Sequence, residues 1–214
     1  MKVTLISKSE PSEELRKAGI SSMGGMIAHA ARVSNPANQF NNETAPKLLQ
    51  YLMREHHWSP FEMVSMCLEI QTTRDIARQI IRHRSFSYQE FSQRYAEVEE
   101  PPEFREARGQ DPKNRQNSVR LEDGPIHEEW RAKQDNAYWA AQVAYKWAIN
   151  NGIAKEQARA VLPEGMTPST IYMNGTIRSW IHYAELRGGH GTQLEHTLIA
   201  QEVSKILDEH VWTK

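Results

Sequence analysis

Polar and apolar residues alternate with a period of two in one part of this chain. From Met63 to Thr72, the apolar residues Val64, Met66, Leu68 and Ile70 are separated by polar or small ones. Successive side chains of a strand point to opposite faces, so this alternation is typical of a strand with one buried face. The pattern therefore predicts a strand over these ten positions.

Elsewhere the apolar residues mostly recur every three or four positions, which indicates helices with one buried face. The predicted helices are residues 22–33, a helix capped by Asn42 and running to about His56, and residues 73–81, 128–150, 153–162, 176–187 and 192–212. Two further strands are predicted at residues 2–7 and 169–173. No repeat or break in composition divides the chain, so we predict a single α/β (α+β) domain over residues 1–214, with a central sheet flanked by helices.

Residues 97–127 interrupt this pattern. They contain Pro101-Pro102, Asp111-Pro112 and Asp123-Gly124-Pro125 and few large apolar side chains. A loop of this length in a compact domain is usually either disordered or functional. Both interpretations stay open here, and the functional one is a lid that covers a substrate.

The composition excludes several classes of protein. Apolar residues make up 39% of the chain and six of its residues are Trp, which is enough for a core and excludes disorder over the whole length. The net charge of −1 argues against general nucleic-acid binding. A single cysteine suits a reducing compartment, and no signal peptide or run of eighteen apolar residues is present. We therefore expect a cytoplasmic protein with neither nucleic acid nor membrane as a partner.

The most informative stretch runs from Arg82 to Tyr95, where three arginines, a glutamate and three serines alternate with aromatic rings. Rings stack on planar groups, and arginine pairs with two oxygen atoms at once. Arg74, Arg78 and Arg82 also recur every four residues along the preceding helix. Such a stripe is often solvated or paired with acids. The aromatic residues that follow favour instead a pocket for a flat, phosphorylated ligand.

Other candidates for chemistry are weaker. Cys67 lies between two apolar residues of the predicted strand with no adjacent cation, so we expect a structural role. The pairs His56-His57 and His182/Glu185 suggest a metal site, but their spacing brings no third or fourth ligand, so we predict no metal. Gly188-Gly189-His190-Gly191 has no preceding strand and is interpreted as a turn, and no phosphate-binding glycine motif is present.

At this point the residues resemble a known family. Arg82-His83-Arg84, followed after seven residues by Ser92, matches the R-H-R-x7-S signature of flavin-dependent thymidylate synthases. Gln79 before the signature and Glu90 and Arg94 near its end also match the family. Further matching segments follow the family's order over about residues 25–205: His57-x-Ser59-Pro60-Phe61-Glu62, Ala158-Arg159-x-Val161-Leu162-Pro163, Arg178-Ser179 and Leu186-Arg187. The resemblance therefore covers nearly the whole chain.

The resemblance implies a homotetramer of α/β subunits that binds FAD between subunits. It implies conversion of dUMP to dTMP, with methylenetetrahydrofolate as carbon donor and NADPH as reductant. The residues implied for FAD are Ser59, Arg82, His83, Arg84, Glu90, Thr176, Arg178 and His182, of which Thr176 and His182 stand where the family often has Asn. Those implied for the nucleotide are Gln79, Arg82, Glu90, Phe91, Ser92, Gln93, Arg94, Arg159 and Arg187. Of these, the resemblance implies that Gln79, Ser92, Gln93, Arg94 and Arg159 hold chiefly the phosphate and that Arg187 lies against the uracil ring.

Arg187 is the predicted catalytic residue. Methylation needs a nucleophilic carbon 5 of uracil, and without an attacking cysteine a buried guanidinium can supply this by stabilising negative charge on the ring. Ser92 has no evident adjacent base and is interpreted as a contact to phosphate or base. Two alternatives remain. One is a nucleotide- or RNA-binding module that uses the arginine stripe, and the other is a metal-dependent nucleotide hydrolase built on the His pairs.

Overall fold

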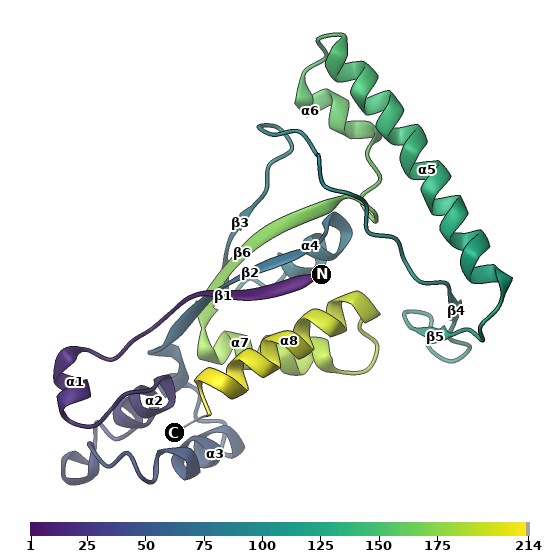
Figure 1. Ribbon diagram of the computed structural model, residues 1–214. Coiled ribbons are helices and arrows are strands. Elements are labelled where there is room, and N and C mark those ends of the chain that lie inside the picture. The colour runs from purple at the N-terminus through teal and green to yellow at the C-terminus, as the bar shows by residue number, and fades with distance from the viewer. Residues whose placement is uncertain (213–214) are drawn as a thin grey trace.

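A four-stranded antiparallel sheet forms the centre of the computed structural model, which describes residues 1–212 (Figure 1). In spatial order its strands are β1 (Lys2–Lys8), β2 (Ser65–Thr73), β6 (Pro168–Thr176) and β3 (Ser87–Glu90). The two central strands pair over nine positions, from Ser65 opposite Thr176 to Thr73 opposite Pro168. The prediction of a mixed α/β fold with a central sheet is confirmed.

One face of the sheet carries the hydrophobic core. Met66, Leu68 and Ile70 of β2 are at most 1% exposed. Three helices pack on this face, α4 (Arg74–Ile80), α7 (Ile177–Gly188) and α8 (Leu194–His210). The opposite face is polar and partly open, and there the Tyr172 hydroxyl donates to Glu69 Oε2 at 2.7 Å. The period of two in the sequence thus predicted both the strand β2 and its buried face.

The N-terminal part folds into short helices beside the sheet. These are α1 (Glu13–Lys17), α2 (Met23–Ala31) and α3 (Ala45–Arg54), with 3-10 turns η1 (Pro36–Asn38) and η2 (Ser59–Glu62). The prediction that Asn42 caps α3 is wrong. The helix starts after Thr44 without a side-chain cap, and Pro46 in its first turn needs no partner for a backbone N–H. The Asn42 amide instead donates to the Gly19 carbonyl at 3.4 Å.

Helix α3 ends at an unusual residue. His56 adopts a φ of 56°, and no other non-glycine residue within 1–212 has a positive φ. The His57 N–H bonds the Leu52 carbonyl at 2.8 Å and the His56 N–H bonds the Met53 carbonyl at 3.1 Å. This is the Schellman arrangement of a helix C-terminus, whose left-handed position is normally occupied by Gly. His56 therefore holds the turn that leads into η2 at a conformational cost.

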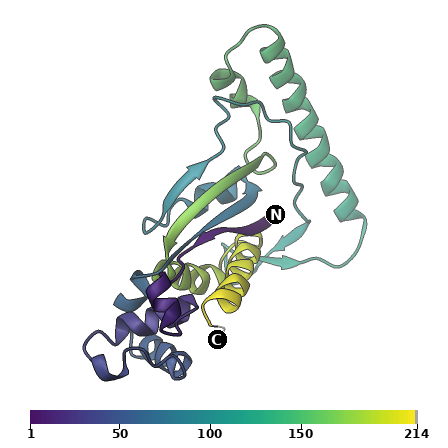
Figure 2. The same ribbon diagram turned by 60° about the vertical axis from the view of Figure 1, so that its left-hand side comes forward.

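A long helical arm stands apart from the sheet (Figure 2). It consists of α5 (Pro125–Asn150), α6 (Lys155–Ala158) and the 3-10 turn η3 (Arg159–Val161), with a small apolar cluster around Tyr145. The predicted helix 153–162 is thus shorter and ends in a 3-10 turn. The predicted loop 97–127 is corrected as well, because it contains the hairpin of β4 (Arg108–Gln110) and β5 (Ser118–Arg120) and the start of α5.

Two strand predictions also need correction. Strand β3 was not predicted, and β6 is nine residues long where the sequence predicted only 169–173. Within residues 1–212, no helix combines the length and apolar character needed to cross a membrane.

Candidate active site

The signature segment forms a tight turn between α4 and β3. The Tyr88 hydroxyl lies 3.0 Å from the Ile80 carbonyl and 2.6 Å from the His83 carbonyl, and it can donate to either. The ring of Phe86 crosses β6 at Gly175, where a Cβ atom would lie 2.4 Å from the ring. Only glycine leaves room for this crossing, and Phe86 then packs 4.7 Å from the ring of Trp180. The turn that carries Arg82, His83 and Arg84 is therefore fixed at both ends.

Arg187 reaches this turn from the C-terminal end of α7. Its Nε donates to Nε2 of His83 at 2.8 Å. Because Nε2 accepts this bond, the hydrogen of a neutral His83 ring must be on Nδ1. Burial, and then the positive charge of Arg187, lowers the pKa of His83 to about 4. No hydrogen bond or ion pair within residues 1–212 engages the two terminal nitrogens of Arg187, which are thus free to bind an anion or a carbonyl oxygen.

The residues implied for FAD lie around this turn. Arg82 and Arg84 are exposed and have no bonding partner within residues 1–212. Ser179 of α7 donates to the Ser85 carbonyl at 3.4 Å, so the turn lies against the start of α7. Thr176 caps that helix by accepting from the Ser179 N–H at 3.3 Å. Thr176 therefore has a structural role in addition to any contact with a cofactor.

The turn η2 lies beside the same helix. Arg178 forms an ion pair with Glu62, and the ring of His182 lies 4.5 Å from that of Trp58. These two contacts place Ser59 next to α7. We use the name cofactor group for the residues that this region brings together, which are Ser59, Arg82, His83, Arg84, Thr176, Arg178, His182 and Arg187.

A second set of predicted residues lies at the other end of the sheet, near α6. Arg94 lies 3.5 Å from the Glu156 carboxylate, and Arg159 Nε donates to the Glu156 carbonyl at 3.4 Å. The side chain of Gln93 is buried, and its Nε2 has no partner within residues 1–212. We use the name nucleotide group for Ser92, Gln93, Arg94 and Arg159.

Glu90 and Phe91 lie between these two groups. Glu90 accepts from Ser169 Oγ at 2.8 Å and lies 3.4 Å from Arg74. Phe91, which is 37% exposed, lines a small pocket with Ser169. Both residues are thus placed by the end of β3 where it pairs with Ile171 of β6.

A single chain does not bring the two groups together. Arg94 and Arg159 both contact Glu156, whereas Arg187 contacts His83, so the two groups have no contacting residue in common within residues 1–212. In Figure 1, α6 and α7 lie at opposite ends of β6. The structure of one subunit therefore does not show these arginines meeting at a shared site.

The arginine stripe of α4 is paired rather than free. Arg78 forms an ion pair with Glu164, Arg74 lies 3.4 Å from Glu90, and only Arg82, beyond the end of the helix, is unpaired in residues 1–212. Neutralised arginines are poor contacts for a phosphate backbone, which weakens the interpretation as an RNA-binding module. Over the same residues, no group of three or more His, Cys, Asp and Glu side chains is placed to hold a metal ion.

The sequence did not single out Gln193 and His196, two polar residues that contact the predicted substrate residue Gln79. Gln79 Nε2 donates to Gln193 Oε1 at 2.8 Å, and its Oε1 lies 3.4 Å from Nδ1 of His196. His196 is fully buried, and burial, then Arg187 and His83, lower its pKa to about 3. The sequence does contain a signal that His196 is buried, because Ile199 and Val203 follow it three and seven positions later and so share its face of α8.

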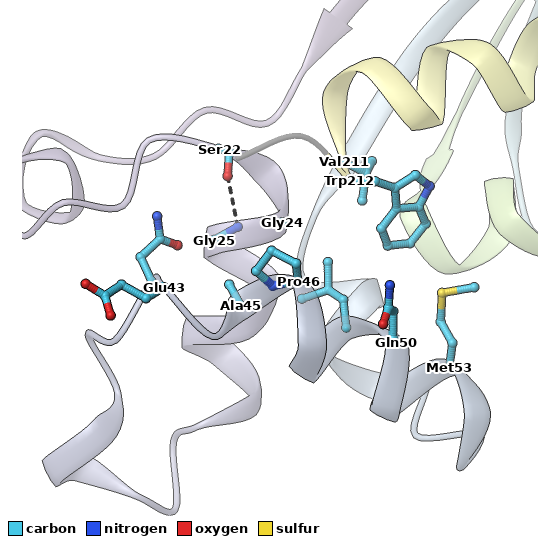
Figure 3. A pocket seen from close by; sticks show the side chains of 12 residues that line it. Ser22, Gly24, Gly25, Glu43, Ala45, Pro46, Gln50, Met53, Val211 and Trp212 are labelled. Atoms are coloured by element: carbon cyan, nitrogen blue, oxygen red, sulfur yellow. Dashed lines mark hydrogen bonds between the residues drawn. The ribbon is translucent and has the colours of Figure 1, made fainter.

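An apolar cavity of about 510 Å³ lies away from these residues, between α2, α3 and the end of the chain (Figure 3). Leu49, Met53 and Trp212 line it together with Ser22, whose hydroxyl oxygen accepts from the Gly25 N–H at 3.1 Å. None of the predicted site residues lines this cavity.

Comparisons with known proteins agree with the signature. The family model described as thymidylate synthase complementing protein matches residues 20–211. A probable flavin-dependent thymidylate synthase of Paramecium bursaria Chlorella virus 1 is 50% identical over 96% of this chain and 93% of its own length. The flavin-dependent thymidylate synthase of a Synechocystis strain is 50% identical over 87% of this chain and 85% of its own.

A solved structure supports the fold. It is the UMP/dUMP methylase PolB of Streptomyces cacaoi bound with 5-Br dUMP, with a TM-score of 0.80, 27% identity, and coverage of 98% of this chain and 90% of the other. The signature turn, the sequence relatives and this fold lead to one conclusion: the chain belongs to the thymidylate synthase complementing protein family, that of the flavin-dependent thymidylate synthases.

Proposed function

We propose that this chain is an enzyme that converts dUMP to dTMP with a bound flavin, taking the carbon from methylenetetrahydrofolate and the reducing equivalents from NADPH. The observation that carries the proposal is the contact between Arg187 and His83. A neutral His83 accepts the Nε–H of Arg187 at 2.8 Å, which aims the rest of the guanidinium away from the turn. A fixed, half-buried cation of this kind is suited to stabilise negative charge on a pyrimidine.

The cofactor group fits FAD. Arg82 and Arg84 are unpaired within residues 1–212, and unpaired arginines are suited to the pyrophosphate oxygens of a dinucleotide. The hydroxyls of Ser59 and Ser85 are exposed on the same region and can donate to phosphate. When bound there, FAD supplies the transfer of reducing equivalents from NADPH, while the protein supplies orientation and electrostatics.

Arg187 would act on the uracil ring without a nucleophile from the protein. Its free terminal nitrogens can donate to a ring carbonyl oxygen as negative charge develops, which makes carbon 5 more nucleophilic. Cys67 does not fit the role of a nucleophile. It lies in β2 opposite Asn174, and burial raises the pKa of its thiol, which disfavours the reactive thiolate.

The nucleotide group would hold the phosphate and base of dUMP. Arg94 contacts the carboxylate of Glu156 and Arg159 contacts its backbone carbonyl, and the Nε2 of Gln93 is a buried donor that lacks an acceptor in residues 1–212. A buried donor without a partner is costly, and a bound nucleotide would relieve that cost. Within this group, Gln93 is therefore the residue that argues for a bound ligand, since Arg94 is exposed and paired with Glu156.

We further propose a homotetramer in which the nucleotide group of one subunit faces the cofactor group of another. The reason is the separation of the two groups within one chain, which leaves each half of the site incomplete. Closed symmetric assembly is the usual way in which two different surfaces of one chain meet. We place the enzyme in the cytoplasm, as its single cysteine suits a reducing compartment. We also keep the segment 97–127, whose last three residues begin α5, as a candidate lid over folate.

The visible spectrum of the purified protein tests the function directly. We expect a yellow protein, or one that becomes yellow with added FAD, whose flavin absorbance is bleached by NADPH in the presence of dUMP. With methylenetetrahydrofolate, dTMP should then form. A colourless protein that does not take up FAD would contradict the assignment. RNA binding with steep salt dependence would instead support the binding module, and a chelator-sensitive hydrolysis of nucleotides would support the hydrolase.

A further inference from the structure

A chain of side-chain hydrogen bonds links Gln79 to the start of α8. Gln79 Nε2 donates to Gln193 Oε1 at 2.8 Å, and Gln193 Nε2 donates to Glu195 Oε2 at 2.8 Å. In the other direction, Gln79 Oε1 lies 3.4 Å from His196 Nδ1, and His196 Nε2 lies 3.0 Å from the Tyr183 hydroxyl. Of these five residues only Gln79 belongs to the predicted substrate site.

The chemistry of Glu195 sets the direction of this chain. An ionised carboxylate only accepts, so Gln193 must turn its nitrogen toward Glu195 and its oxygen toward Gln79. Gln79 must then donate to Gln193 and turn its own oxygen toward His196. It follows that His196 carries its hydrogen on Nδ1 and accepts from the Tyr183 hydroxyl at Nε2.

Both ends of the chain are held in place. Arg105 lies 3.7 Å from Oε1 of Glu195, and the two side chains are 18% and 14% exposed. Arg105 also donates to Asp75 of α4 at 2.9 Å, so its guanidinium spans α4 and α8. At the other end His196 and Tyr183 are 0% and 1% exposed, which leaves water little access to reverse the order of donors and acceptors.

We infer that Glu195 and Arg105 are positioning residues that fix the orientation of the Gln79 amide and so the pattern of donor and acceptor that Gln79 presents to the pyrimidine. This inference rests on the proposed function, because it requires Gln79 to contact the base of the nucleotide. The position of Gln79 favours this contact, since it lies beside His196, whose ring is 6.3 Å from that of His83, the partner of Arg187. In the fixed orientation Gln79 keeps one Nε2 hydrogen and one Oε1 lone pair for a ligand. Uracil carries an acceptor oxygen on carbon 4 where cytosine carries a donor amino group. A single orientation of the amide can therefore favour uracil nucleotides over cytosine nucleotides.

The variant Glu195→Gln tests this in the full-length, flavin-loaded enzyme. Glutamine has nearly the same shape but can donate as well as accept, so both directions of the chain become possible. We measure the dissociation constants of dUMP and dCMP, with flavin content and the thermal midpoint as checks on folding. The preference for dUMP over dCMP should fall about tenfold, which equals about 1.4 kcal/mol. Flavin content should stay at the level of the unmodified protein.

A matched control comes from the same helix. Glu202 is exposed on α8, and within residues 1–212 it pairs only with Lys205, at 2.6 Å, so Glu202→Gln should leave the preference unchanged. The variant Arg105→Gln removes the cation that holds Glu195 and should shift the preference in the same direction. The Arg105 variant also allows the inference to be tested if Glu195→Gln does not fold. A purely structural defect would weaken dUMP and dCMP alike and leave their ratio intact.

The outcomes separate the inference from the proposed function. An unchanged dUMP/dCMP ratio in the folded Glu195 or Arg105 variant overturns the inference. So does a Gln79→Ala variant that binds both nucleotides as the unmodified protein does, because Gln79 then does not contact the base. In both cases dTMP formation by the unmodified protein would still support the proposed function. A protein that binds flavin but forms no dTMP would instead contradict that function.

Discussion

Buried His196 should make the stability of this protein fall between pH 7.5 and pH 5. Burial, with Arg187 and His83 as further causes, lowers the pKa of His196 to about 3 from 6.5. At pH 5 the unfolded chain therefore binds a proton that the folded chain excludes, and stability is lost as the pH falls from the unfolded value toward the folded one. Only the part of this pH range below the unfolded pKa of 6.5 contributes, which is about 1.5 pH units down to pH 5. At 1.36 kcal/mol per unit, the protein should be about 2 kcal/mol less stable at pH 5 than at pH 7.5. His83, whose pKa is about 4, acts in the same direction but is only half-buried and contributes less.

Urea unfolding at the two pH values, at fixed protein concentration, measures this difference. The variant His196→Asn should reduce the pH-dependent loss by about 2 kcal/mol, because asparagine does not titrate in this range. It should also lower stability at both pH values, since one partner in a buried network changes. His127→Gln is the matched control, because His127 lies outside the core at the start of α5. A pH-dependent loss that is the same in His196→Asn and in the unmodified protein would refute the reasoning.

The remaining predictions concern catalysis and local strain. Arg187→Ala should lower kcat by roughly 100-fold to 1000-fold, as expected for loss of an electrostatic stabiliser. The control variant Arg16→Ala, on the exposed helix α1, should keep kcat unchanged. Near-normal turnover with normal dUMP binding in the Arg187 variant would exclude the activating role. Cys67→Ala should keep full dTMP formation, whereas a folded but inactive variant would restore a cysteine mechanism. His56→Gly should raise the free energy of unfolding by about 1 kcal/mol, because glycine adopts the left-handed conformation without strain. A chemical denaturation curve that shows a loss instead would mean that the His56 side chain makes a stabilising contact.

Much of the fold could be predicted because its signals are local. The alternation in β2 and the helical spacing of α7 and α8 depend on neighbours within a few residues, and the structure confirms these elements. Strand β3 was missed because its four residues, Ser87 to Glu90, are mostly polar and become a strand only by pairing with β6. Asn is a favoured residue type at the N-cap of a helix, but the side chain of Asn42 bonds to Gly19 instead, and α3 begins later, with Pro46 in its first turn.

The site could be predicted only in part for a similar reason. The signature identified the turn, yet the contact between His83 and Arg187 joins positions 104 residues apart. The bond from Gln79 to Gln193 spans 114 residues. Pairings at such separations leave no periodic trace in a single sequence. The roles of the individual site residues stay predictions until the variants described above are measured.

The separation of the two arginine-bearing groups allows complementation between defective subunits. A preparation with Arg94 replaced and another with Arg187 replaced would each lack one half of every catalytic centre. If centres form between subunits, dissociating and reassembling the two preparations together should restore activity, because some centres would pair an intact half from each. Recovery on mixing, with none in either preparation alone, would show that one catalytic centre belongs to two polypeptides.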